Sequence, residues 1–355
     1  MKKLLVLLLV IILSGCVRQM IVDDVNLLNG IGFDKEGHDI RVTTLVPQYQ
    51  PNKETKNETY SHVGKLETNT TKAANNQTAK PFAHGTLEVV LIQKELAKEG
   101  IFELLDQVRR HPEIGSRVYL LIADHSARDI LETDHSPIPT ATIISELIEH
   151  NTKFGMLPKT NLHIFRSTHT NEGIDPILPV ITIMDNKITL KGIALFQDDH
   201  YNSMIEDQEE TFVFKLLLEK TDLRDSLTLH LKDESAIVRI EEFNSKRNFS
   251  IKKAMSSPEI TIDIKLKAYV TEYSKGQITK KIKAQIEKEV AEAIEQKALM
   301  LISRFQEEQI DPLGIGLEVK IRTRNWTQEK WNTLYPLATF KVHANVDVIH
   351  YGVYE

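Results

Sequence analysis

The stretch SPEITIDIKLKAYVTEY, residues 257–273, alternates apolar and polar side chains more regularly than any other part of the chain. From Ile260 to Val270 every second residue is apolar, and the residues between are polar or charged. Because successive side chains of a strand point to opposite faces, this pattern predicts a strand with one buried and one solvated face. TFKVHANVDVIHYGVY, residues 339–354, repeats the pattern near the end of the chain.

A long amphipathic segment, residues 280–308, lies between these two stretches. Its apolar residues fall on one stripe at helical spacing, and lysine, glutamate and glutamine fill the other positions. Such a helix buries its stripe against a sheet, so we expect it to lie across an antiparallel sheet. Pro312 and the glycines Gly314 and Gly316 should end it, and GLEVKIR, residues 316–322, predicts a returning strand.

Residues 86–131 predict a strand–helix–strand unit. The segments 87–92 and 118–123 are apolar enough to form buried strands, and helical spacing of apolar residues dominates between them. Ser126 is placed to cap the next helix, and residues 141–157 predict a further amphipathic helix. Alternating strands and helices of this kind indicate a βαβ-like arrangement in the first half of the chain.

The region before this unit predicts a hairpin followed by a polar segment. Apolar residues lead to Phe33, the letters DKEG turn the chain at Gly37, and alternation resumes at Ile40. Residues 52–80 are rich in Asn, Thr, Lys and Glu and cannot bury enough apolar surface to offset their ordering entropy. We interpret 52–80 as a polar, mobile loop or a weak edge hairpin.

Two further strands, residues 177–184 and 187–196, flank Asp185 and Asn186, a candidate two-residue turn. We place a domain boundary near 185. A short helix is expected at 206–220 and a strand at 236–243. The predicted fold is therefore α+β and multi-domain, with mixed or antiparallel sheets and packed helices. Its predicted parts are a signal peptide at 1–15 and domains at 16–185, 186–250 (small) and 251–355.

Sequence signatures of catalysis are missing. The chain has no phosphate-binding G-x-x-x-x-G-K-[ST] motif, no H-E-x-x-H zinc signature and no G-x-S-x-G elbow. The two GIG triplets, at 30–32 and 314–316, are interpreted as turn glycines. VRRHPE, residues 108–113, is open to two interpretations, an anion-binding patch or a basic helix end that complements the helix dipole. We therefore expect no enzyme activity, no cofactor and no metal.

The N-terminus has the form of an export signal. Two lysines precede an apolar run from residue 4 to residue 13, and small residues follow before Cys16, the only cysteine. As a helix the run covers about half of a ~30 Å hydrocarbon core, so it is a poor permanent span. Without residues 1–15, 42 basic residues face 50 acidic ones, a net charge of −8. This balance argues against nucleic acid as a partner, which calls for a basic patch.

The tetrapeptide Leu13-Ser14-Gly15-Cys16 resembles a bacterial lipobox. The resemblance implies cleavage between Gly15 and Cys16, an S-diacylglycerol thioether on Cys16, and N-acylation (palmitate) of the freed amine. Such a lipoprotein would be held on the outer face of the membrane. Two or more acyl chains anchor stably where one does not, at about 0.8 kcal/mol per buried methylene.

Three longer stretches resemble the Ger(x)C lipoproteins, the C subunits of spore germinant receptors. AKEGIFELLDQVRRHPEIGSRVYLLIADHSARDIL resembles their N-terminal domain, and EGIDPILPVIT with ITLKGIALFQDDHYNSMIEDQEETFVFKLL resembles their central segment. QIDPLGIG, residues 309–316, is similar to their C-terminal domain, as are the two tryptophans that follow it and the last alternating strand.

This resemblance implies a non-enzymatic receptor subunit needed for germination in response to nutrients. It would be lipid-anchored through Cys16 to the outer face of the spore inner membrane, beside integral-membrane A and B subunits. It also implies an α+β fold.

Two other functions share part of the evidence. A solute-binding lipoprotein of an ABC-type importer would also carry a lipobox, but it should show two doubly wound lobes around a cleft. A lipid-anchored cell-wall hydrolase would need a carboxylate or metal constellation that the sequence does not reveal.

Overall fold

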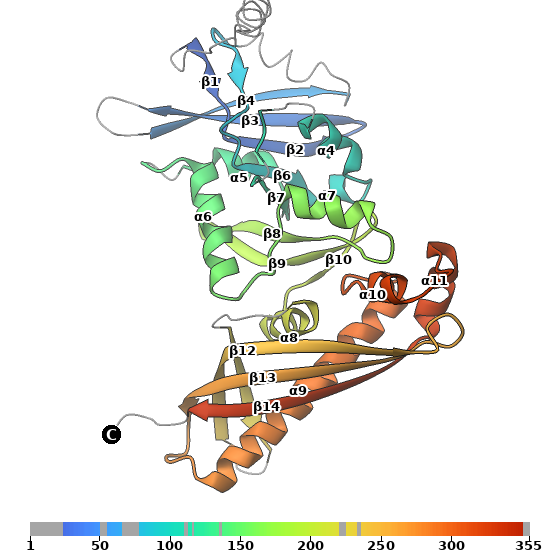
Figure 1. Cartoon of the computed structure of the whole chain (residues 1–355). Coiled ribbons are helices and arrows are strands. Elements are labelled where there is room, and N and C mark those ends of the chain that lie inside the picture. Colours follow the sequence, from blue (N-terminus) through green and yellow to red (C-terminus); the bar gives the residue numbers. More distant parts are fainter. Residues whose placement is uncertain are drawn as a thin grey trace, which may run out of the picture.

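The computed structural model describes residues 24–49, 55–65, 78–109, 113–115, 117–134, 137–219, 225–232 and 236–350 (Figure 1). Two sheets dominate it, an eight-stranded sheet in the N-terminal body and a four-stranded sheet in the C-terminal body. A small parallel pair, β1 (Asn26–Leu27) with β5 (Phe82–Ala83), accompanies the larger sheet. The predicted mixed α+β class is confirmed.

The large sheet has the strand order β10-β9-β8-β7-β6-β2-β3-β4. Its four central strands run parallel, and antiparallel hairpins extend it on both sides. The strands are β2 (Gly30–Glu36), β3 (Asp39–Tyr49), β4 (Thr55–Gly64), β6 (Val89–Gln93), β7 (Tyr119–Ala123), β8 (Ile177–Met184), β9 (Lys187–Gln197) and β10 (His200–Ile205).

Both faces of the parallel strands are covered by helices, which explains their continuous apolar sequence. Along β6, Val90 and Ile92 join one core with residues of α3, α4 and α7, whereas Val89 and Leu91 join the other with residues of α5 and α6. The helices are α3 (Lys94–Ala97), α4 (Phe102–Arg109), α5 (Ala127–Glu132), α6 (Thr140–Lys153) and α7 (Leu162–Thr170). The predicted βαβ unit is confirmed as β6–α3–α4–β7.

Three local predictions in this body are confirmed. The Ser126 side chain accepts a hydrogen bond of 3.0 Å from the Asp129 backbone N–H and caps α5. Asp185 and Asn186, with φ of 49° and 58°, form the two-residue turn of the β8–β9 hairpin, and positive φ at both positions suits the twist of a hairpin. Gly37, with φ of 63°, turns β2 into β3.

The GIG triplet at 30–32 was predicted to be a turn, and this is wrong. Gly30 and Gly32 lie inside β2, under α5. A Cβ on Gly32 would lie 3.0 Å from Leu131 Cδ1 and 3.1 Å from Ala127 Cβ. These glycines therefore allow a helix to approach the strand closely, a need that the local sequence does not show.

The prediction of a mobile loop at 52–80 is wrong for residues 55–64, which form β4. This strand pairs along its whole length with β3, from Tyr49↔Thr55 to Ile40↔Gly64. An edge strand pairs with only one neighbour, so a polar sequence is compatible with this position. The alternative prediction, an edge hairpin, describes residues 55–64 correctly. Residues 50–54 and 66–77 lie outside the described residues.

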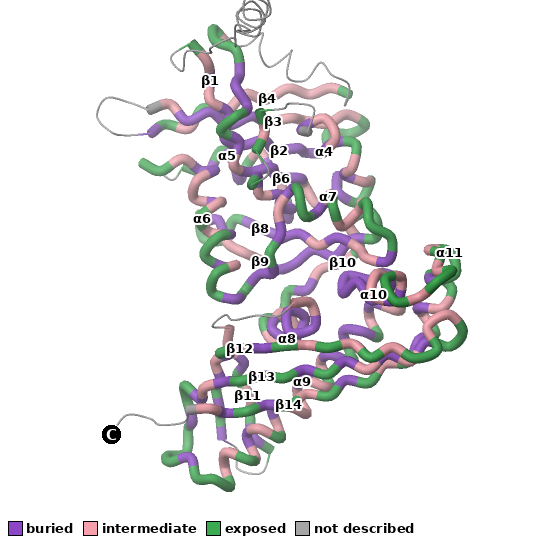
Figure 2. The backbone as a smooth tube through the Cα atoms, in the orientation of Figure 1, coloured by how far each residue is buried: buried purple, intermediate pink, exposed green. Residues whose placement is uncertain are grey.

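The second sheet has the order β11-β12-β13-β14, and α9 crosses it (Figure 1). Figure 2 shows buried and exposed residues alternating along its strands, as the sequence of β13 predicts. The elements are α8 (Gln208–Leu218), β11 (Ser226–Leu231), β12 (Ala236–Lys252), β13 (Glu259–Tyr273), α9 (Lys280–Glu307) and β14 (Thr339–His350). Antiparallel pairing joins β11 to β12 and β12 to β13, whereas β14 runs parallel to β13 because the chain crosses over through α9.

The predicted boundary near 185 and the separate middle domain at 186–250 are not what the sheets show. The β8–β9 hairpin spans 185, and β9 and β10 complete the first sheet. The segment after Ile205 joins the second body, where Phe214 of α8 packs edge-on against Phe305 of α9 at 5.9 Å. A hairpin turn cannot separate two cores when both of its strands pair in one sheet.

The predicted strand at 316–322 is also wrong, because these residues form α10 (Ile315–Arg322). The Asp311 carboxylate accepts hydrogen bonds from the Ile315 and Gly316 backbone N–H groups and so caps the helix. Ile315 and Val319, four residues apart, are buried together, whereas Ile321 is 72% exposed. The buried residues are therefore spaced as on one side of a helix. In a strand, Ile321 would have been buried together with Val319. Two short elements follow, α11 (Gln328–Leu334) and the 3-10 turn η2 (Tyr335–Leu337).

Candidate functional site

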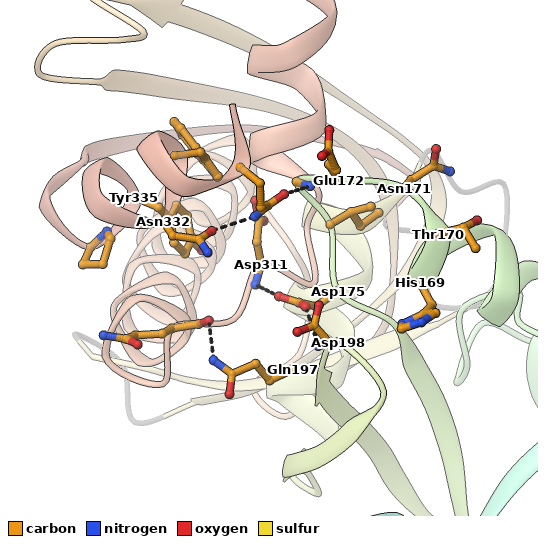
Figure 3. Close-up of a pocket in the computed structure, with 16 residues that line it drawn as sticks. His169, Thr170, Asn171, Glu172, Asp175, Gln197, Asp198, Asp311, Asn332 and Tyr335 are labelled. Carbon is orange, nitrogen blue, oxygen red and sulfur yellow. Dashed lines mark hydrogen bonds between the residues drawn. The ribbon is translucent and has the colours of Figure 1, made fainter. Parts of the chain in front are cut away.

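A cavity of about 200 Å³ lies where the two bodies meet (Figure 3). The N-terminal body contributes the end of α7, the loop before β8 and the β9–β10 turn. The C-terminal body contributes the linker between α9 and α10, together with α11 and η2. Its walls therefore come from segments that are more than 100 residues apart in the sequence.

Two copies of the tripeptide Ile-Asp-Pro, at 174–176 and 310–312, meet at this site, and Ile174, Asp175 and Asp311 line the cavity. The Asp175 backbone N–H donates to the Asp311 carbonyl oxygen at 2.9 Å, and the Asp311 N–H donates to Asp175 Oδ2 at 2.6 Å. Asp175 Oδ1 accepts a third hydrogen bond, of 2.9 Å, from the Asp198 N–H. The following proline keeps each aspartate extended, which leaves its backbone groups open to the other body.

Glycines allow the two bodies to touch backbone to backbone beside these aspartates. Gly173 has a φ of +82°, and a Cβ there would lie 2.5 Å from the Gly316 carbonyl carbon. The Leu317 N–H donates to the Gly173 oxygen at 2.8 Å, and the Gly173 N–H donates to Gln328 Oε1 at 2.7 Å. The contact requires glycine at position 173, for its conformation and for the lack of a side chain.

Burial controls the acid chemistry of the cavity. Asp311 is 5% exposed, and burial raises its pKa to about 7 although the Gly316 and Ile315 N–H groups oppose the shift. Burial likewise raises the pKa of Asp175, against the hydrogen bonds from the Asp311 and Asp198 backbones. Among the described residues that line the cavity, none is Lys or Arg. The basic side chain of the lining is His169, whose charge lowers the pKa of Asp175 but does not outweigh the effect of burial.

Aromatic side chains close the cavity on the side of the C-terminal body. Trp331 and Tyr335 are 1% and 4% exposed and line it. The Tyr335 hydroxyl has no hydrogen-bond partner among the described residues. Burial raises its pKa well above the usual value, and the charges of Asp311 and Asp175 add to that shift. His169 also lines the cavity, and its ring lies against that of Phe102, with 4.5 Å between the ring centroids and a tilt of 38°.

A second contact between the bodies lies at the end of α6. Lys215 of α8 is 1% exposed, donates a hydrogen bond to the Gly155 carbonyl oxygen and lies 3.9 Å from Asp225 Oδ2. Burial lowers the pKa of Lys215 and raises that of Asp225 to about 6. Gly155 has a φ of +87°, and a Cβ there would lie 2.9 Å from Asp225 Cβ. Here a partly buried acid has a buried cation beside it.

The residue singled out from the sequence, Cys16, lies outside the described residues. Residues 110–112 of the basic segment 108–113 lie outside them as well, so both interpretations of that segment stay open. Within the ranges that the structure describes, there is no group of three or more Asp, Glu, His or Cys placed to hold a metal ion. No described helix is both long and apolar enough to cross a membrane.

Sequence reasoning missed the cavity, although its signal was present. The Ile-Asp-Pro triplet occurs twice, each time between a helix and the next element, and each copy lies close to a glycine. Because proline restricts the backbone of the residue before it, two copies of Ile-Asp-Pro could have suggested that both make similar contacts. Their pairing with each other depends on how the two bodies pack.

Comparisons with known proteins match nearly the whole chain to spore germination proteins. Residues 18–183 match the family described as spore germination protein N-terminal domain, and residues 191–352 match spore germination B3/GerAC like, C-terminal. The chain is 29% identical over 363 residues to spore germination protein GerQC of Bacillus cereus, covering all of both chains.

A second relative, the putative spore germination protein YfkR of Bacillus subtilis (strain 168), is 23% identical over 358 residues, covering 94% of this chain and 92% of its own. The crystal structure of the GerBC protein shares the fold with a TM-score of 0.61, at 14% identity, over 90% of this chain and 97% of that one. The matched families change between 183 and 191, near the boundary predicted at 185, although the first sheet continues to Ile205.

Proposed function

This chain belongs to the GerAC-like spore germination family, and we propose that it is the lipid-anchored, non-enzymatic C subunit of a nutrient germinant receptor. The observation that carries the proposal is the match of both family domains, in order, behind a predicted export signal at residues 1–15 that is followed by Cys16. Its partners would be the integral-membrane A and B subunits of the receptor, in the spore inner membrane.

The proposed anchor sets how the molecule would face the membrane. Seven residues lie between Cys16 and Asp24, the first described residue, and the eight Cα–Cα steps that join the two reach at most about 30 Å. Asp24 leads directly into β1, at the end of the molecule remote from β11–β14 (Figure 1). An anchor on Cys16 would therefore hold the N-terminal body near the lipid and place the C-terminal sheet away from it.

None of the described helices could cross a membrane. Anchoring would explain how such a subunit meets partners that lie in the membrane. A protein confined to the membrane surface meets integral-membrane subunits at a high effective concentration, so modest contacts are enough. An acidic body, with a net charge of −6 over the whole sequence, would gain little from charge attraction to anionic lipid. The acyl chains would then supply the membrane affinity.

Removal of the thiol tests this function. In the spore-forming host, Cys16→Ala should move the protein from the membrane fraction to the soluble fraction and weaken germination through this receptor. A Cys16→Ala chain fused behind a transmembrane helix is the matched control, because it restores location without the acyl chains and should restore germination. A Cys16→Ala protein that stays in the membrane while spores respond normally contradicts the anchor. Failure of the A and B subunits to co-purify with the wild-type chain contradicts the receptor role.

A further inference from the structure

One face of the C-terminal sheet carries exposed, basic side chains. Helix α9 crosses the other face (Figure 1), and exposed residues alternate with buried ones along the strands (Figure 2). The residues of β13 that point away from α9 include Lys265 and Lys267, and both are exposed. Strand β12 adds Lys246, also exposed, to the same face.

The three lysines are placed against the usual pairing of charges in a sheet. Lys246 and Lys265 lie directly opposite each other in the β12–β13 register, and Lys267 follows two residues along β13 on the same face. Side chains in opposite positions have Cβ atoms about 4.5–5.5 Å apart, and like charges in such positions destabilise the pair. A local rule that is broken without a compensating contact is typical of a functional surface.

The acids nearest to these lysines do not pair with them. Asp263 precedes Lys265 on this face of β13, and within the described part of the chain it forms no ion pair with any of the three lysines. Asp347 of β14 is the neighbour of Lys267 in register, but its carboxylate lies 3.7 Å from Lys283 of α9. On α9, by contrast, lysines pair with glutamates one turn away. The sheet face thus lacks the compensation that the helix has.

An exposed aromatic side chain stands beside the lysines. Phe243 occupies the bulge of β12, where the register shifts between Glu242 and Asn244, and it is 49% exposed. Its ring meets that of Tyr269 edge-on, with 5.4 Å between the centroids. Asn244 is directly opposite Lys267, so the aromatic pair adjoins the lysines. Bulges re-aim side chains, and an aromatic anchor with a polar rim is the usual composition of a protein-binding hot spot.

We propose that this face of the C-terminal sheet, around Phe243, Lys246, Lys265 and Lys267, binds an acidic protein segment in which carboxylates flank an apolar side chain. The carboxylates would lie between the facing lysines, and the apolar side chain would cover Phe243. Anionic lipid offers similar charge, but an anchor on Cys16 would hold this sheet away from the lipid. The inference rests on the proposed function in that respect alone.

The test is fluorescence anisotropy with the purified full chain in mild detergent at about pH 7. The probe is a labelled synthetic peptide, Glu-Glu-Glu-Phe-Glu-Glu-Glu. We expect a dissociation constant of about 100 µM or lower, and weaker binding as salt is raised, because the charges are exposed. The same peptide with glycine in place of phenylalanine should bind about threefold more weakly, since it leaves Phe243 uncovered. Absence of binding to the phenylalanine peptide overturns the proposal.

Three variants locate the binding. Lys246→Gln/Lys265→Gln should weaken binding about tenfold, the loss of two exposed charge contacts. Lys153→Gln/Lys288→Gln is the matched control, because it removes two exposed lysines from α6 and α9 and should leave the affinity unchanged. Equal losses in the two double variants would assign the binding to net charge rather than to this face. Phe243→Ser should abolish the preference for the phenylalanine peptide, and a preference that persists overturns the site.

Two other occupants are outcomes of the same experiment. Dihexanoyl phosphatidylglycerol, a soluble anionic lipid, should not displace the peptide at equal concentration, and displacement would overturn the proposal in favour of a lipid surface. Self-association of the chain that Lys246→Gln/Lys265→Gln abolishes would overturn it in favour of a second copy. The experiment uses no membrane and no other subunit, so its failure is distinguishable from failure of the proposed receptor role.

Discussion

The two contacts between the bodies hold their acidic side chains in different ways. At the end of α6, Asp225 lies 3.9 Å from Lys215, a buried cation that also donates to the Gly155 carbonyl. At the cavity, Asp175 and Asp311 are held by backbone N–H groups, and none of the described lining residues is Lys or Arg. The first contact is complete without a ligand. The second holds its acids with backbone N–H groups beside a cavity.

The largest expected effect concerns the first contact. Lys215→Met at about pH 8 leaves Asp225 buried without its cation, and we expect the free energy of unfolding to fall by about 3 kcal/mol, measured by urea denaturation. The double variant Lys215→Met/Asp225→Asn should recover most of the loss. At about pH 5 the loss should shrink, because Asp225, whose pKa is about 6, then takes up a proton. An equal loss at both pH values would show that the pair is not what stabilises this contact.

The next effect concerns the close approach at the second contact. Gly173→Ala forces a Cβ to within 2.5 Å of the backbone of α10 at a φ of +82°, so we expect a loss of about 3 kcal/mol. Gly276→Ala is the matched control, because Gly276 has a φ of +86° and an added Cβ there would meet nothing within 4 Å. It should lose only about 1 kcal/mol, the conformational part. Similar losses in the two variants would mean that the bodies do not depend on this contact.

The smallest effect is a dependence on pH that separates the two contacts. An acid whose pKa is higher in the folded state stabilises the fold while protonated, and this stability is lost as the pH rises through the folded pKa. For Asp311 the loss starts near the ordinary value of 3.8 and ends near 7, whereas for Asp225 it ends near 6. Between about pH 6 and pH 8 the Asp311 contribution should be about 1 kcal/mol.

Thermal unfolding at several pH values measures this contribution. Asp311→Asn should flatten the decline in stability between about pH 6 and pH 8, whereas Asp263→Asn, on the exposed face of β13, should leave it unchanged. The change of stability with pH is a better measure than the stability at one pH. Asn at position 311 also disturbs the two hydrogen bonds that Asp311 accepts from backbone N–H groups, and this lowers stability at every pH. A decline that persists in Asp311→Asn would assign the pH dependence to other groups.

Local patterns in the sequence were enough for most of the regular elements. The alternation of β13, the stripe of α9 and the Ser126 cap each reflect a requirement that neighbouring residues meet among themselves. The same reasoning failed at 30–32, at 55–64 and at 316–322. In each of these, packing against another segment decides the structure: α5 lies over β2, β3 pairs with β4, and Ile315 and Val319 are buried in the C-terminal core.

By itself, the sequence determined an α+β chain with a long helix across a sheet, and it supplied the lipobox-like end at Cys16 on which the proposed anchor rests. It also contained both Ile-Asp-Pro triplets, but nothing in either one states that it meets the other. Only the tertiary structure brings Asp175 against Asp311, across the contact between the bodies, and leaves a cavity beside them. Periodicity reports which face of an element is buried, whereas a cavity depends on which buried faces meet and where they fail to fill the space between them.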